Sequence, residues 1–218
     1  MRKESPWMLF ATTVVSHLPM LPTTYLFFKR HYVYEAVIAI FGLTCSLMYH
    51  VCQSFNTTIF LSELEWHRLD NITAIAALGM WSVFICAFKN PVIERSAKYF
   101  TLIVAILLQE KDPWNTVYTF FPLALFACLP LGVYISNKRL PAVHYRSLVT
   151  GLFFMALAGP FFVAGLNDTA DPYRFFHGMW HLLGATSAYF LWIMVKIPGA
   201  TSAYVKGASI SVRGDTLL

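Results

Sequence analysis

The chain alternates long apolar runs with short polar joints. An α-helix rises about 1.5 Å per residue, so roughly 20 apolar residues are needed to cross the hydrocarbon core of a bilayer. Seven runs approach this length, near residues 7–28, 33–52, 66–88, 97–109, 116–136, 147–166 and 175–196. The pattern predicts an all-α integral membrane protein, built as a bundle of seven transmembrane helices. We expect one membrane domain over residues 1–196 and a short tail over 197–218.

The fourth run is the weakest of the seven. Residues 97–109 are about 13 in number, below the roughly 17 to 25 that a straight span needs. Extension at either end, through Val92 or through Trp114, would complete the span. If this run does not cross the membrane, the count is six and the orientation predicted from charge fails.

Composition supports a membrane protein. The chain is 57% hydrophobic and only 12% charged, whereas soluble domains carry about 25% charged residues. The net charge of +5 could suggest nucleic acid, but the basic residues lie in the joints between apolar runs, where they orient the helices in the bilayer. We expect no nucleic-acid partner. The four cysteines form no CxxC motif and imply no disulfide framework.

The distribution of lysine and arginine predicts the orientation. With seven spans and the N-terminus outside, the inner side holds 11 of the 16 basic residues, namely Lys29, Arg30, Lys89, Arg95, Lys98, Lys138, Arg139, Arg146, Lys196, Lys206 and Arg213. The outer side holds the other 5, namely Arg2, Lys3, Arg68, Lys111 and Arg174. Because cytoplasmic joints are enriched in Lys and Arg, this bias places the N-terminus outside and the C-terminus in the cytoplasm.

Polar residues from three segments fall at the same predicted depth. His177 and His181 are four residues apart at the start of the seventh run, so they share one helix face. Ser46 and His50 share a face where the second run ends, and Asp70 lies about one turn into the third. Ionisable residues inside a membrane are rare and usually face the bundle interior. The topology therefore predicts that these five residues meet near the outer surface.

These residue types suit a metal site. Three histidines, His50, His177 and His181, together with a water form the open tetrahedral shell of a catalytic zinc. The metal would lower the pKa of that water toward 7. Asp70 would orient the water and accept its proton, and Ser46 would donate a hydrogen bond to the water or to a developing oxyanion.

Structural roles for the same residues stay open at this point. The histidines could be interfacial residues that hydrogen-bond to neighbouring helices. Asp70 could form a salt bridge with Arg68 or Arg174, and Ser46 could bond the carbonyl four residues before it. His17, near the middle of the first run, is expected to hydrogen-bond within the bundle rather than to bind metal.

The order of these residues resembles a family signature. Ser46-xxx-His50, then Asp70, then His177-xxx-His181 is similar to the pattern of the CREST superfamily of seven-helix membrane proteins, which includes alkaline ceramidases and the progestin and adiponectin receptors. The resemblance implies a zinc site on the three histidines, with Asp70 and Ser46 beside it. It also implies hydrolysis of a lipid amide or ester bond, as in ceramidases and in a relative that deacylates GPI anchors.

Within that superfamily the chain resembles the branch that contains myomaker and transmembrane protein 8. The length is similar to that of myomaker, and the stretch 29–36 together with His50-Val51-Cys52 resembles the opening of that branch. Myomaker is a cell-fusion factor in which the same site could be structural. The cysteine-rich end of vertebrate myomaker has no counterpart here, so lipidation of the tail is not expected.

Two functional hypotheses follow, with a lipid or hormone receptor ranked third. The first is a zinc-dependent membrane hydrolase that acts on a lipid amide or ester bond at the outer side of the bilayer. The alternative is a myomaker-like fusion or remodelling protein with a structural zinc site. The expected cofactor is Zn²⁺, the expected partner is a ceramide-like lipid, a phospholipid or a GPI lipid, and a homodimer is left open. The expected location is the plasma membrane or a secretory-pathway membrane.

Overall fold

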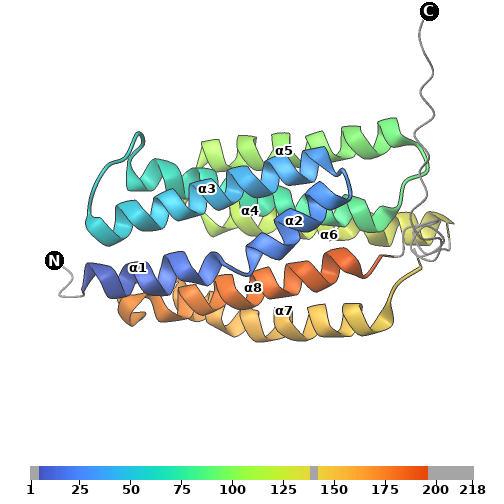
Figure 1. Cartoon of the computed structure of the whole chain (residues 1–218). Helices are drawn as coiled ribbons and strands as arrows, with labels where there is room; N and C mark the ends of the chain where they lie inside the picture. Colours follow the sequence, from blue (N-terminus) through green and yellow to red (C-terminus); the bar gives the residue numbers. More distant parts are fainter. Residues whose placement is uncertain (1–4, 138–141, 196–218) are drawn as a thin grey trace, which may run out of the picture.

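The computed structural model describes residues 5–137 and 142–195, which fold into helices joined by short connections (Figure 1). The predicted tail over 197–218 lies outside the described residues. The elements are α1 (Pro6–Val14), the 3₁₀ turn η1 (Val15–His17), α2 (Met20–Lys29), α3 (Val33–Phe55), α4 (Glu63–Cys86), α5 (Pro91–Lys111), α6 (Thr116–Asn137), α7 (Tyr145–Gly165), the 3₁₀ turn η2 (Pro172–Arg174) and α8 (Phe175–Ile193). The all-helical prediction is confirmed for this part of the chain.

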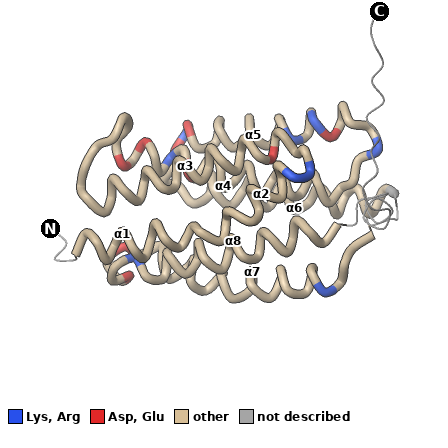
Figure 2. The backbone as a smooth tube through the Cα atoms, viewed as in Figure 1, with Lys and Arg blue, Asp and Glu red and all other residues tan. Residues whose placement is uncertain are grey.

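Within residues 5–137 and 142–195, four helices, α3, α4, α6 and α7, are long and apolar enough to cross a membrane. Charged residues gather toward the two ends of the bundle and leave its middle almost uncharged (Figure 2). This arrangement suits a bilayer, because a charged side chain is costly at the centre of the hydrocarbon. The full count of seven spans and the side on which each terminus lies stay predictions.

The first segment differs from the prediction of one helix over 7–28. It is divided into α1 and α2 by the turn η1. Pro19 explains the break, because proline has no N–H to donate to the carbonyl four residues before it and its ring clashes with that carbonyl. The Val15 carbonyl instead accepts from the N–H of Leu18 at 3.1 Å, which tightens the chain into a 3₁₀ turn.

The fourth segment is longer than its apolar run of 97–109. α5 begins at Pro91, one residue after Asn90, whose side chain caps the helix by accepting from the N–H of Val92 at 2.8 Å. Proline at the first helical position and asparagine before it favour a helix start. The extension thus occurs at the N-terminal end of the segment, through Val92, and gives a helix of 21 residues.

The two halves of the broken first segment lie between two other helices. Both α1 and α2 pack against α3 on one side and against α8 on the other, and Figure 1 shows them crossing the front of the bundle. α8 also packs on α7, while α4 packs on α3, α5 and α6. The turn η1 is therefore positioned where side chains from α3 and α8 can meet.

Candidate metal centre

Two helices far apart in sequence bring the predicted histidines together. Nε2 of His50, on α3, lies 3.2 Å from Nε2 of His181, on α8. One turn earlier on α8, Nε2 of His177 lies 2.9 Å from the same His181 atom. A tetrahedral zinc with Zn–N bonds of 2.0–2.1 Å separates its ligand nitrogens by about 3.3 Å. Both distances from the His181 Nε2 atom are close to that separation.

The chemistry of imidazole explains why such an arrangement suits a cation. A neutral imidazole has one N–H and one lone pair, so a given Nε2 either donates or accepts. His181 Nε2 faces two other Nε2 atoms at close range. A metal ion accepts the lone pairs of all three nitrogens at once, whereas hydrogen atoms on them would compete for one acceptor. The donor set therefore fits a divalent transition metal that prefers nitrogen ligands, such as Zn²⁺.

A short hydrogen-bond chain orients His50. Its Nδ1 lies 3.4 Å from Oε1 of Gln53, and the Gln53 amide donates to the Tyr49 hydroxyl at 3.1 Å. An N–H on Nδ1 that donates to Gln53 leaves the lone pair on Nε2, directed at the other histidines. Second partners of this kind are typical of metal-binding histidines.

Asp171 holds the start of α8, which carries the other two predicted ligands. Its carboxylate accepts from the N–H of Phe176 at 2.8 Å and from the N–H of His177 at 3.0 Å. The intervening turn reaches this geometry with left-handed backbone at Tyr173 and Arg174, both at φ 54°. Sequence reasoning missed this cap, because the usual N-cap spacing is only two or three residues.

Ser46 and Asp70 lie beside the histidines and contact each other. The Asp70 carboxyl group and the Ser46 hydroxyl are hydrogen-bond partners, which joins α4 to α3. Two cations considered as salt-bridge partners for Asp70 have acidic partners elsewhere. Arg68 pairs with Glu110 at 3.2 Å, and Arg174 pairs with Asp168.

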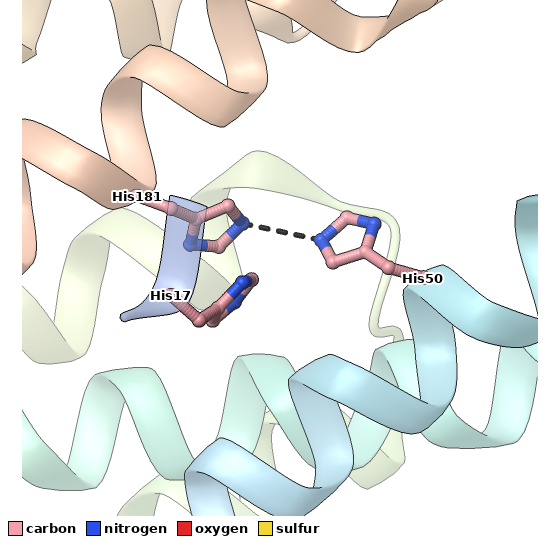
Figure 3. Close-up of side chains that lie close together, drawn as sticks. All are labelled: His17, His50 and His181. Carbon is pink, nitrogen blue, oxygen red and sulfur yellow. Dashed lines mark hydrogen bonds between the residues drawn. The ribbon is translucent and has the colours of Figure 1, made fainter. Parts of the chain in front are cut away.

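The structure adds His17, which sequence reasoning set aside as a bundle residue. One ring nitrogen from each of His17, His50 and His181 lies within 4.8 Å of the others (Figure 3). The expected hydrogen bonds are also present, since Nδ1 of His17 lies 2.7 Å from the Thr13 carbonyl oxygen and Nε2 lies 2.8 Å from Ser46 Oγ. The signal in the sequence was Pro19, which breaks the helix two residues after this histidine.

The group of mutually close nitrogens differs from the predicted set in two respects, because it includes His17 and does not include His177. His50 and His181 belong to both, His17 joins them by the nitrogen distances, and His177 adjoins through its 2.9 Å contact with His181. His17 and His50 are buried, at 2% and 0% exposed, whereas His177 and His181 are partly exposed. Four imidazoles from the first segment, α3 and α8 thus form one cluster of short contacts inside the bundle.

Comparison with known proteins places the chain among membrane proteins. It is 24% identical over 192 aligned positions to human transmembrane protein 8B and 26% identical over 192 positions to the mouse protein of that name. Each comparison covers 81% of this chain but 39% of the relative, so the chain matches well under half of those longer proteins. Residues 5–182 match the model of a family described as a protein of unknown function, DUF3522. Because that match covers most of the chain and includes the helix break, α3 and the two histidines of α8, the chain belongs to the DUF3522 family.

Proposed function

We propose that this protein is a membrane-remodelling protein of the myomaker and transmembrane protein 8 type, in which a zinc ion ties α3 to α8. The observation that carries the proposal is that the Nε2 atom of His181 lies close to the Nε2 atoms of both His50 and His177. Similarity to transmembrane protein 8B supports the branch. The proposal includes the seven-span topology with the N-terminus outside, which puts the zinc near the outer surface of a plasma or secretory-pathway membrane.

A structural zinc suits the surroundings of the cluster. α1 and α2 pack between α3 and α8, so a metal at η1 would join helices that flank the broken segment. His50 is fully buried, and water has poor access to its side of the site. Zinc held by protein nitrogens contributes folding free energy directly, because the unfolded chain does not offer the preformed site. The expected result is a rigid outer half of the bundle.

A second candidate is hydrolysis of a lipid amide or ester, and the Ser46–Asp70 contact favours it. Zinc bound at the histidines would supply a Lewis acid that activates water. Asp70 would accept a proton, and Ser46 would donate its one hydroxyl hydrogen to a developing oxyanion. The partly exposed histidines of α8 would leave one side open to a ceramide-like lipid, a phospholipid or a GPI lipid.

An open apolar cavity near the start of α8 supports a lipid as the partner in either case. It has a volume of ≈ 490 Å³. Its lining comes from α1, η2 and the first turn of α8, and consists of Met8, Thr12, Pro172, Tyr173, Phe175 and Phe176. Phe176 precedes His177, so an acyl chain in this cavity would lie beside the metal site.

The Asp70→Asn variant separates the two functions. Asparagine keeps the size of the side chain but cannot accept a proton as a base. Unchanged cell mixing with intact zinc content supports the structural role, whereas loss of function with intact zinc supports chemistry at Asp70. Turnover by the purified protein on ceramides, lysolipids or GPI-linked substrates would overturn the structural proposal. Asp112→Asn, in the joint after α5, is the matched control.

A further inference from the structure

The break in the first segment directs one histidine into the bundle. His17 is the last residue of η1, and its side chain is 2% exposed. Because Pro19 ends the regular helix, the chain turns here with 3₁₀ geometry, and the Leu18 N–H bonds the Val15 carbonyl. The break therefore has a consequence at the cluster: it brings an imidazole from α1–α2 to the histidines of α3 and α8.

The hydrogen bonds of His17 define which nitrogen faces the cluster. Nδ1 lies 2.7 Å from the Thr13 carbonyl oxygen, which only accepts, so Nδ1 carries a hydrogen and donates it. In the neutral imidazole the lone pair is then on Nε2, where it accepts from the Ser46 hydroxyl at 2.8 Å, so a metal ion would replace this hydrogen bond. A backbone carbonyl that fixes the tautomer in this way is a common partner of a metal-binding histidine.

The distances bring His17 within reach of the same ion as its neighbours. Its ring centroid lies 4.1 Å from that of His181 and 5.5 Å from that of His50. One nitrogen of each of the three rings lies within 4.8 Å of the others, compared with about 3.3 Å between ligands of a tetrahedral zinc. Zinc binding would therefore require the buried ring to move closer to His50 and His181.

We propose that His17 is a fourth protein ligand of the zinc, which makes a closed shell of four imidazoles from η1, α3 and α8. This inference rests on the proposed zinc centre and deepens it. A zinc with four protein ligands has no open position for water and is typical of structural sites, whereas catalytic sites keep one position free. Four neutral imidazoles leave the ion's charge of +2 uncompensated. Asp70 is the acidic residue that is linked to His17 through Ser46.

The test is X-ray absorption at the zinc edge of the purified full chain, which counts imidazole ligands. We expect four nitrogens at about 2.0–2.1 Å in the wild type, with outer-ring scattering from four imidazoles. In His17→Gln the count falls to three imidazoles and one oxygen, and zinc affinity falls about 10-fold or more. Glutamine can still donate to the Thr13 carbonyl, so it preserves the local hydrogen bond. His144→Ala, an exposed histidine at the start of α7, is the control.

Each outcome supports or overturns His17 as the fourth ligand. Three imidazoles and one oxygen in the wild type, unchanged in His17→Gln, would overturn the fourth ligand while leaving the zinc centre intact. A wild-type protein that binds no zinc would overturn the zinc centre itself. Ser46→Ala removes the hydrogen-bond partner of His17 Nε2 but not its lone pair, so it keeps four imidazoles if His17 is a ligand. If His17 only positions Ser46, the two variants should give the same three-imidazole spectrum.

Discussion

Two buried polar clusters lie in this apolar bundle, and they are built differently. In the first, Lys98 of α5 pairs with Glu35 of α3 at 2.6 Å and with Glu94 on its own helix. In the second, the Nε2 atoms of His50 and His181 face each other at 3.2 Å across α3 and α8. The lysine cluster contains both charges of its ion pairs. The histidine cluster instead brings several ring nitrogens with lone pairs close together.

The difference indicates which of the two clusters is expected to bind a cation. An ammonium group between two carboxylates is complete, and its role is to hold α3 against α5. Converging imidazole nitrogens gain little from one another, because each neutral ring brings a single hydrogen. They are stabilised together by a cation. A buried polar cluster whose opposite charges pair is therefore structural, whereas one in which nitrogen lone pairs outnumber the hydrogens between them indicates a cation.

The sharpest test of this contrast is His181→Ala, because His181 contacts both of the other predicted ligands. The variant should lose stoichiometric zinc. The free energy at stake is on the order of 10 kcal/mol, the value typical of structural zinc sites. Metal analysis of the purified protein measures the loss, and His144→Ala should retain the wild-type zinc content. Full zinc occupancy in His181→Ala would mean that the histidine cluster is a hydrogen-bonded core and not a metal centre.

The lysine cluster should respond in the opposite way. Lys98→Met leaves the buried Glu35 carboxylate, 3% exposed, without its partner. Removal of one member of a buried ion pair costs about 3–5 kcal/mol, which should appear as a lower unfolding temperature in detergent. Zinc content should stay at the wild-type level, because the change lies outside the histidine cluster.

Arg95→Met is the matched control for the lysine variant. Arg95 is exposed on the same helix and bonds only the Pro91 carbonyl among its described contacts, so its replacement should change stability by no more than about 0.5 kcal/mol. Equal stability of the two variants would show that the ion pairs of Lys98 do not stabilise the fold. Loss of zinc in Lys98→Met would show that the two clusters are coupled.

The sequence predicted the histidine contacts between α3 and α8 from simple geometry. The spacing of His177 and His181 placed both on one helix face, and alternating helix directions put His50 at the same depth. Asp70 and Ser46 followed from the same argument, and the structure places them in contact with each other. These relations depend on helix period and direction, which local sequence determines well.

The remaining features depend on tertiary contacts that local sequence does not determine. The predicted fourth run began at residue 97, after Glu94, and included Lys98. Pairing of Lys98 with Glu35 from another helix and with Glu94 makes these charges compatible with α5. The sequence predicted one segment over 7–28, and nothing in it specified that a turn before Pro19 directs His17 toward α8. The cap by Asp171 likewise depends on how η2 folds back.

The smallest expected effect concerns the packing that supports the histidine cluster. A methyl group added at Gly178, on α8 between the two histidines, would collide with the Thr12 carbonyl oxygen of α1. Alanine normally favours a helix over glycine by about 0.5–1 kcal/mol. Overpacking against backbone costs about 1–3 kcal/mol, so the clash should win and Gly178→Ala should be destabilising.

The zinc affinity of this variant refines the comparison further. Because α1 leads directly into η1, displacement of α1 from α8 should move His17 away from His181. Zinc binding should then weaken, whereas the Lys98 cluster at the other end of the bundle should be unaffected. Gly132→Ala on α6 is the control, because nothing lies within 4 Å of its added methyl group and helix propensity alone should make it neutral or slightly stabilising. If Gly178→Ala lowers the unfolding temperature but leaves zinc affinity unchanged, the close approach of α1 to α8 serves packing only, and the position of the broken segment does not control the metal site.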